Sequence, residues 1–161
     1  MAITLGQARY GKAETRVVRV RRDGDRHEIE DLNVSVALGG DLADTYLTGD
    51  STKVLPTDSQ RNTVYAFAQE RGIDEIEDFA LLLARHFVGS QPPIRWARVA
   101  IEEYRWERVS VGGSPAPHSF ARTAAFGRPN GNEVYVAADR PYGLIEGTVL
   151  RDDAPPAGEA W

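Results

Sequence analysis

Cysteine is absent from this 161-residue chain, and methionine and histidine are scarce, with one and three copies. The lack of cysteine excludes disulfides, thiolate nucleophiles and cysteine-ligated metal sites. No two histidines have the spacing of a metal-binding pair on one helix. The P-loop, the dinucleotide-binding fingerprint and the Gly-x-Ser-x-Gly motif are also missing. No cysteine site, paired-histidine metal site or common nucleotide-binding motif is therefore indicated.

Long apolar runs and an excess of positive charge are missing as well. No stretch approaches the ~18 apolar residues of a membrane span, and residues 1–6 lack the features of a signal peptide. The C-terminal Glu159-Ala160-Trp161 is not a peroxisomal address. A formal net charge of −5 disfavours nucleic acid as a partner. We therefore expect a cytoplasmic protein that binds neither membranes nor nucleic acid.

What the chain does contain is a regular order of strands and helices. Alternating apolar residues predict strands over 15–22 and 27–38, joined by a turn at Asp23-Gly24-Asp25. Arginines of the first strand and acidic residues after the turn would pair across this hairpin. Residues 41–54 are less regular. One face of the second strand is apolar and carries Val34, Val36 and Leu38.

Two amphipathic helices are predicted next. Thr57 and Gln60 have the spacing of a capping box at the start of the first helix, which ends at Gly72. Asp74 and Glu77 have the same spacing at the second helix, which we expect to end at Gly89. The second helix has an apolar stripe of Ile76, Phe79, Ala80, Leu83 and Phe87.

The remaining chain predicts further strands. We expect one long strand over 94–111, a turn at Gly112-Gly113, and short strands over 119–126, 133–138 and 144–150. This order indicates an α+β fold with an antiparallel sheet and two helices on one face. The other face would carry apolar residues too, with nothing in the chain to cover it. Such sheets are expected to join partners edge to edge into a barrel.

Several short segments, taken in order, resemble the uricases, which have the tunnelling fold (T-fold) in its ββααββ order. The segments are Ala8-Arg9-Tyr10-Gly11-Lys12, Leu38-Gly39-Gly40-Asp41, Tyr46-Leu47-Thr48-Gly49-Asp50, Thr57-Asp58-Ser59, Asn62-Thr63-Val64-Tyr65-Ala66, Arg105-Trp106-Glu107-Arg108 and Pro117-His118-Ser119-Phe120. The resemblance implies a single T-fold domain over 1–151. Residues 152–161 would be a Pro/Gly-rich tail that starts the link to a second T-fold domain.

The resemblance also implies a reaction, namely cofactor-independent oxidation of urate by O2 to 5-hydroxyisourate and H2O2. Lys12 and Thr57 stand where the family has its proton-relay pair. Thr57 and the backbone N–H of Asp58 stand where the family grips the purine. These roles make physical sense, because a helix N-terminus favours an anion and a desolvated lysine can act as a base. The family uses no metal or other cofactor, and its site lies between subunits of an assembly, typically a homotetramer.

The chain also departs from the family. Uricases are about twice as long, and their second half supplies a histidine, an arginine and a glutamine that have no counterpart here. The aromatic residue that stacks on the purine would follow 144–151, where 154–161 match poorly and Trp161 is not assigned. Pro56 replaces a small residue. The chain therefore resembles the N-terminal half of a uricase, either a fragment, a cleaved product or one partner of a complementary C-terminal half chain.

Each candidate residue also has a plainer interpretation. A lone lysine such as Lys12 is usually a solvated surface charge, and Thr57 is by its spacing an N-cap residue. Asp58 is a first-turn charge whose amide matters more than its carboxylate. For His118, packing or hydrogen bonding is favoured over binding a ligand. The alternative function is a non-catalytic single-domain T-fold module that binds a purine or pterin, or only assembles.

Overall fold

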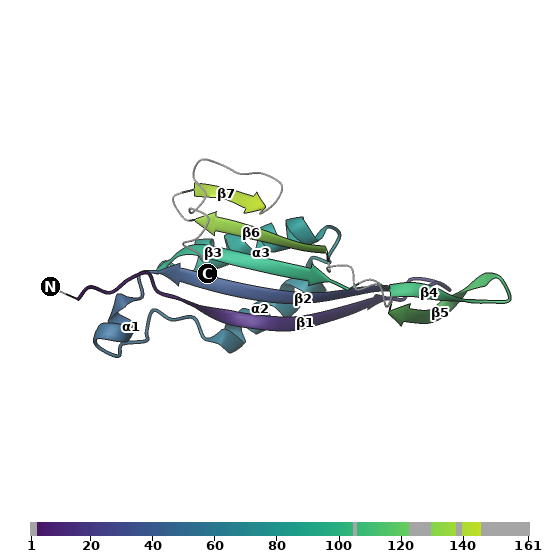
Figure 1. Cartoon of the computed structure of the whole chain (residues 1–161), viewed down its shortest axis with the longest axis horizontal. Helices are drawn as coiled ribbons and strands as arrows, with labels where there is room; N and C mark the ends of the chain where they lie inside the picture. Colours follow the sequence, from purple (N-terminus) through teal and green to yellow (C-terminus); the bar gives the residue numbers. More distant parts are fainter. Residues whose placement is uncertain (1–2, 105, 123–129, 138–139, 146–161) are drawn as a thin grey trace.

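A five-stranded antiparallel sheet forms the centre of the computed structural model, which describes residues 3–104, 106–122, 130–137 and 140–145. Its strand order is β1-β2-β3-β6-β7 (Figure 1). The strands are β1 (Arg9–Arg21), β2 (Glu28–Gly40), β3 (Ile94–Glu103), β6 (Asn130–Ala137) and β7 (Arg140–Ile145). The predicted hairpin is confirmed as β1 and β2, although β1 begins earlier than expected.

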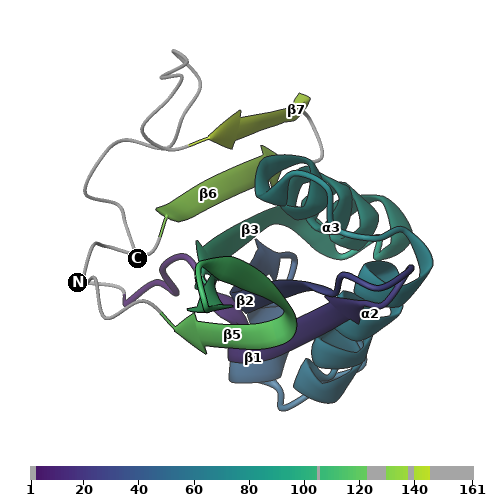
Figure 2. The same cartoon turned by 90° about the vertical axis from the view of Figure 1, so that its right-hand side faces the viewer.

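Two long helices, α2 (Thr57–Glu70) and α3 (Ile76–Ser90), lie on one face of this sheet (Figure 2). Helix α2 packs on β1, and α3 packs on β3 and β6. The predicted α+β arrangement, with two helices on one face, is therefore present. A short helix, α1 (Ala43–Leu47), occupies the segment for which no regular structure was predicted.

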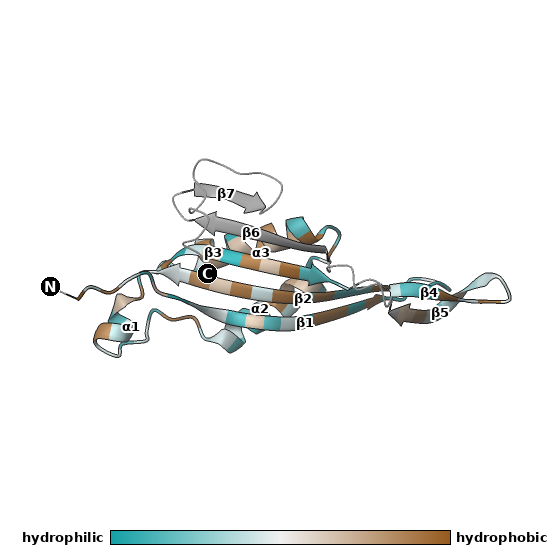
Figure 3. Cartoon of the chain, in the orientation of Figure 1, coloured by the Kyte–Doolittle hydropathy of each residue, from teal (hydrophilic) through white to brown (hydrophobic). Residues whose placement is uncertain are grey.

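The hydrophobic core lies between the sheet and the two helices. Hydrophobic and hydrophilic residues alternate along β2 and β3, as expected for strands with one buried face (Figure 3). Val34, Val36 and Leu38 are at most 4% exposed, as predicted. From α3, the core receives Phe79, Ala80, Leu83, Ala84 and Phe87, which confirms the apolar stripe. Burying a side chain as large as Phe87 stabilises the fold by about 1.5–3 kcal/mol.

Helix α2 begins at Thr57 as predicted, but the capping of both helices differs from the prediction. Pro56 occupies the N-cap of α2 with φ −53° and ψ 141°, and Thr57 is the first helical residue. Gln60 turns back to donate to the carbonyl of Leu55 instead of closing a capping box. Glu75 is the N-cap of α3 and also lacks a side-chain cap. Both predicted capping boxes are therefore wrong.

The helix ends agree better with the prediction. Gly72 follows the C-cap of α2 with a φ of 79°, a left-handed conformation that glycine adopts at little cost, so this end is confirmed. Helix α3 continues past Gly89 to Ser90, one residue beyond the predicted stop.

The long strand predicted over 94–111 is divided into two. After β3 ends at Glu103, β4 (Trp106–Val111) pairs with β5 (Ser114–Arg122) in a separate hairpin that projects from one end of the sheet (Figure 1). Asp31 lies at this break: its carbonyl accepts from the Tyr104 amide at 2.8 Å, and its carboxylate accepts from the Trp106 indole at 2.9 Å. The predicted turn at Gly112-Gly113 is confirmed.

Strands β5, β6 and β7 overlap the three short strands predicted beyond residue 118. Parts of those predictions, at 123–126, 138 and 146–150, lie outside the described residues. The proposed domain boundary at 151 and the tail over 152–161 also lie outside them.

The sheet face opposite the helices is mixed in character. It carries Asn33 and Ser35 from β2 together with Trp96, Arg98 and Glu102 from β3. Trp96 lies against Gly39 so closely that a Cβ at position 39 would overlap its indole. The face also carries the exposed Val18 and Val20 of β1, so the predicted apolar residues are present, although polar and charged side chains lie among them. Among the described strands, β1 is an edge of the sheet, and its open edge is the feature that still favours a partner.

Candidate active site

Lys12 lies on the helix-covered side of the sheet. Cross-strand pairs share a face, and in the β1–β2 register Tyr10 lies opposite Leu38 and Lys12 opposite Val36, both of which are buried under the helices. A β-bulge follows at once, between Lys12 and Thr15, where Glu14 has a φ of 56°. Bulges redirect side chains locally, and they are frequent beside active sites.

The N-terminus of α2 presents unpaired backbone donors. The first helical hydrogen bond runs from the Gln60 amide to the Pro56 carbonyl at 3.1 Å. The amides of Thr57, Asp58 and Ser59 therefore have no partner within the helix. Together with the helix dipole, such amides favour an anion. The side chains of Thr57 and Asp58 are exposed, so this helix end is open to a ligand.

The carboxylate of Asp58 is turned toward solvent and away from this role. It is 74% exposed and pairs with Arg61, one helical turn later, at 3.3 Å. An exposed pair of this kind contributes little to stability. Asp58 is therefore an exposed charge of the first turn, and the role of its amide stays a prediction.

A hydrogen bond brings the two candidate segments together. The Leu55 amide donates to the Tyr10 hydroxyl at 2.8 Å. Tyr10 precedes Lys12 by two residues on β1, and Leu55 precedes Thr57 by two residues at the entrance to α2. Within the described residues, no hydrogen bond joins Lys12 to Thr57 directly. Burial raises the pKa of Tyr10, with the Leu55 N–H opposing this change, so its phenol stays protonated at neutral pH.

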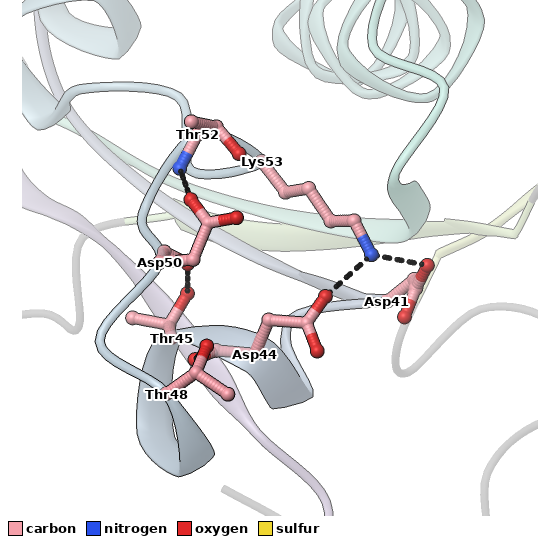
Figure 4. Close-up of polar contacts among 7 residues, drawn as sticks. All are labelled: Asp41, Asp44, Thr45, Thr48, Asp50, Thr52 and Lys53. Atoms are coloured by element: carbon pink, nitrogen blue, oxygen red, sulfur yellow. Dashed lines mark hydrogen bonds and ion pairs between the residues drawn. The ribbon is translucent and has the colours of Figure 1, made fainter.

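The connection between β2 and α2 is held by an ion-pair cluster that the sequence did not reveal. Lys53 Nζ donates to Asp41 at 3.0 Å and to Asp44 at 2.9 Å (Figure 4). These bonds raise the pKa of Lys53 to about 12. The Thr45 hydroxyl donates to the Asp50 carbonyl at 3.2 Å in the same loop. Asp41, Asp44 and Lys53 can be read from the sequence, but the ion pairs between them depend on how residues 41–54 fold.

A second charged cluster lies farther along the hairpin, beside the turn. Arg16 binds the Asp31 carboxylate through Nε at 2.5 Å and through a terminal nitrogen at 2.6 Å, and it lies 4.1 Å from the Tyr104 ring centroid. Asp31 is only 1% exposed. With the Trp106 indole as a further donor, the buried carboxylate is well satisfied. This cluster therefore supports the fold and the break between β3 and β4.

His118 contacts another ring at the turn end of the β1–β2 hairpin. Its ring centroid lies 4.2 Å from that of His27, tilted by 50°. Arg108 donates to the carbonyls of His27 and Pro117, which ties the β4–β5 hairpin to the start of β2. The packing role expected for His118 agrees with this arrangement.

The described residues contain neither a metal-binding cluster nor a membrane-spanning helix. In that part of the chain, no group of three or more His, Cys, Asp or Glu side chains is placed to hold a metal ion. No helix there has the length and apolar character needed to cross a membrane. Trp161 and the neighbouring tail lie outside the described residues.

Comparison with known proteins identifies the family. The family model for uricase matches residues 8–146 of the chain. The uricase of Arthrobacter globiformis is 39% identical over 150 residues, which cover 92% of this chain and 48% of that protein. The chain belongs to the uricase family. Another member, uricase-2 of Phaseolus vulgaris, is 42% identical over 116 residues, covering 71% of this chain and 38% of its own length.

Solved uricase structures agree with the fold. The crystal structure of the Arthrobacter globiformis uricase matches with a TM-score of 0.78 and 34% identity, over 90% of this chain and 47% of that one. A uricase from Bacillus fastidious matches with a TM-score of 0.64 at 20% identity, over 86% of this chain and 50% of that one, which supports the fold alone. The predicted T-fold is confirmed. The chain spans about half the length of these uricases.

Proposed function

We propose that this chain provides the Lys12–Thr57 part of a urate-oxidising site. The observation that carries the proposal is the hydrogen bond from Leu55 to Tyr10, which brings the strand bearing Lys12 to the entrance of the helix bearing Thr57. It is supported by the family match over residues 8–146, because uricases are named for action on urate. The unpaired amides of Thr57 and Asp58 suit the urate anion.

In the proposed reaction, Thr57 and the Asp58 amide hold urate at the N-terminus of α2. Neutral Lys12 accepts a proton from the bound monoanion through the Thr57 hydroxyl, which leaves an electron-rich dianion. Dioxygen takes up electrons from the dianion and adds at the purine C5. Hydrogen peroxide then leaves and water adds, so that urate, O2 and H2O become 5-hydroxyisourate and H2O2.

The proposed site needs further groups from outside this chain. A partner would supply the second half of the purine pocket, as a second T-fold domain, a complementary C-terminal half chain or another subunit of a homo-oligomer such as a tetramer. The open edge of β1 is available for sheet pairing. We retain residues 1–151 as the proposed domain and 152–161 as the start of the link to the second one.

The test is urate turnover by the assembly that contains this chain. We expect loss of the ultraviolet absorbance of urate together with release of H2O2. Thr57→Val, which removes the hydroxyl but keeps the shape, should lower turnover by about 100-fold or more. An assembly with no urate oxidation, or one in which Thr57→Val retains full activity, would overturn the proposal.

A non-catalytic module that binds a purine or pterin, or only assembles, is the second candidate. The observation that favours it is the half-length match, since the chain covers only 48% of the Arthrobacter protein. Titration with 8-azaxanthine, a non-reactive analogue, separates the two proposals. Tight binding by this chain alone without turnover in any assembly supports the module, whereas binding that needs a second chain supports the enzyme.

A further inference from the structure

Gln60, in the first turn of α2, is an unusual residue to find in the core. Its side chain is fully buried, with 0% exposure, although glutamine is mostly found at protein surfaces. Its Nε2 donates to the Leu55 carbonyl at 3.2 Å, and its Oε1 has no hydrogen-bond partner among the described residues. A buried, half-satisfied amide costs stability that leucine in the same space would not. The one bond that it makes therefore points to a role other than packing.

Leu55 is held from two directions. Its amide donates to the Tyr10 hydroxyl, and its carbonyl accepts from Gln60, so both of its polar backbone groups are bound by side chains. One of these side chains belongs to the strand that carries Lys12, and the other to the helix that begins at Thr57. Leu55 also packs against the hydrophobic core.

A shift of the Leu55 backbone is expected to shift Thr57 as well. Only Pro56 separates them, and its ring restricts φ, here to −53°. On the other side, Tyr10 and Lys12 are alternate residues of one strand and share a face, so their relative position is set by the β1–β2 pairing. Leu55 is therefore the point at which the two candidate segments are fixed relative to each other.

We propose that Tyr10 and Gln60 form a clamp on Leu55 that sets the spacing between Lys12 and Thr57. Both are positioning residues that act through the backbone of Leu55. The consequence for catalysis rests on the function proposed above, whereas the clamp itself is a property of this chain. A displacement of about 1 Å between reacting groups can cost up to about 100-fold in rate.

The kinetic test uses the assembly that oxidises urate. Tyr10→Phe and Gln60→Leu should each lower kcat by roughly ten- to 100-fold, with a smaller change in KM. Gln60→Leu removes the half-satisfied amide but also leaves the Leu55 carbonyl without its donor. Because these two effects oppose each other, its melting temperature should change little, which separates misplacement from unfolding. Thr63→Val is the matched control: it removes the hydrogen bond from Thr63 to the Ser59 carbonyl, at 2.8 Å within the same helix, and should leave kcat unchanged.

A second measurement is independent of activity. Hydrogen exchange of the Leu55 amide should be accelerated about tenfold or more in Tyr10→Phe, which removes its acceptor. Exchange of the Leu55 amide should also be accelerated in Gln60→Leu. This variant keeps the Tyr10 hydroxyl as the acceptor of the Leu55 amide but removes the donor to the Leu55 carbonyl, and the clamp couples these two groups. Thr63→Val should not accelerate it.

The two measurements separate failure of the clamp from failure of the proposed function. If the assembly oxidises urate and both clamp variants keep their kcat, the clamp is overturned and the function stands. If no protein oxidises urate but Leu55 exchange is accelerated in both variants, the function fails and the clamp stands. Unchanged Leu55 exchange in Gln60→Leu overturns the clamp in either case.

Discussion

The two ends of the β1–β2 hairpin differ in how their positively charged side chains are paired. Toward the turn, Arg16 binds the buried Asp31, and Arg21 pairs with Glu28 and Glu30 at 3.0 Å. Toward the other end, Lys12 lies opposite Val36, and within the described residues no carboxylate pairs with it. These two arginines are committed to the fold. Lys12 instead lies two residues from Tyr10, whose hydroxyl accepts from the Leu55 amide at the entrance to α2. A cation that is not committed to an ion pair of the fold is a candidate for chemistry.

The strongest test of this comparison is to remove Lys12. Lys12→Met should lower urate turnover by about 100-fold or more, while the free energy of unfolding changes by less than about 0.5 kcal/mol. Arg19→Met is the matched control, since it removes a cation of the same strand that pairs with Glu30 at 3.6 Å. Its turnover should be unchanged. Urate assays and urea denaturation of both variants provide the comparison, and equal activities would contradict it.

At the turn end of the hairpin, where Arg16 binds Asp31, substitutions should change the free energy of unfolding. Arg16→Met leaves the carboxylate of Asp31 buried without its ion-pair partner, which should cost about 3–5 kcal/mol. Asp31→Asn should cost less, because the Arg16 side chain is 43% exposed and can turn to water. Urea denaturation of the two variants measures both values. An equal or larger loss of unfolding free energy in Asp31→Asn would contradict this expectation. It would show that the burial of the Asp31 carboxylate does not determine the cost of breaking the pair.

Much of this hairpin could be predicted from the sequence, because its signals are local. Alternation of apolar residues marks the strands, and the arginines before the turn and the acidic residues after it pair as expected. The break between β3 and β4 could not be predicted, since it depends on Asp31. This residue contacts the Tyr104 backbone and the Trp106 side chain more than 70 positions later.

The candidate site was predictable only in part. Lys12 and Thr57 were named from a resemblance, because their own pattern shows no more than a lone lysine and a helix start. The spacing of Thr57 and Gln60 predicts a capping box, but it does not show that Gln60 would instead donate from Nε2 to the Leu55 carbonyl, with Pro56 at the N-cap. The contact of Tyr10 with that segment joins residues 45 positions apart, so only the folded chain reveals it.

At the other end of the hairpin, the ion pairs of Lys53 with Asp41 and Asp44 should be lost at high pH. The pKa of Lys53 is raised from 10.5 to about 12 by Asp44 and Asp41. Its contribution to stability is therefore fully present below pH 10.5 and is lost as the pH rises through about 12. The difference in unfolding free energy between the wild type and Lys53→Met should shrink from pH 9 to pH 11.5, with Lys53→Arg as the control that keeps its charge. A constant difference would contradict the raised pKa.

At the turn end, a smaller effect is expected at low pH. Burial lowers the pKa of His27 below 6.5. His118, Arg22 and Arg108 lower it further, because positive charge on these neighbours disfavours a protonated His27. The unfolded chain then binds the proton more readily, so the contribution of neutral His27 is present above pH 6.5 and is lost as the pH falls through the lowered value. Urea denaturation at pH 8 and pH 5 should show a larger loss in the wild type than in His27→Gln. An NMR titration that places the His27 pKa above 6.5 would contradict this, and would mean that the paired end of the hairpin tolerates a further cation.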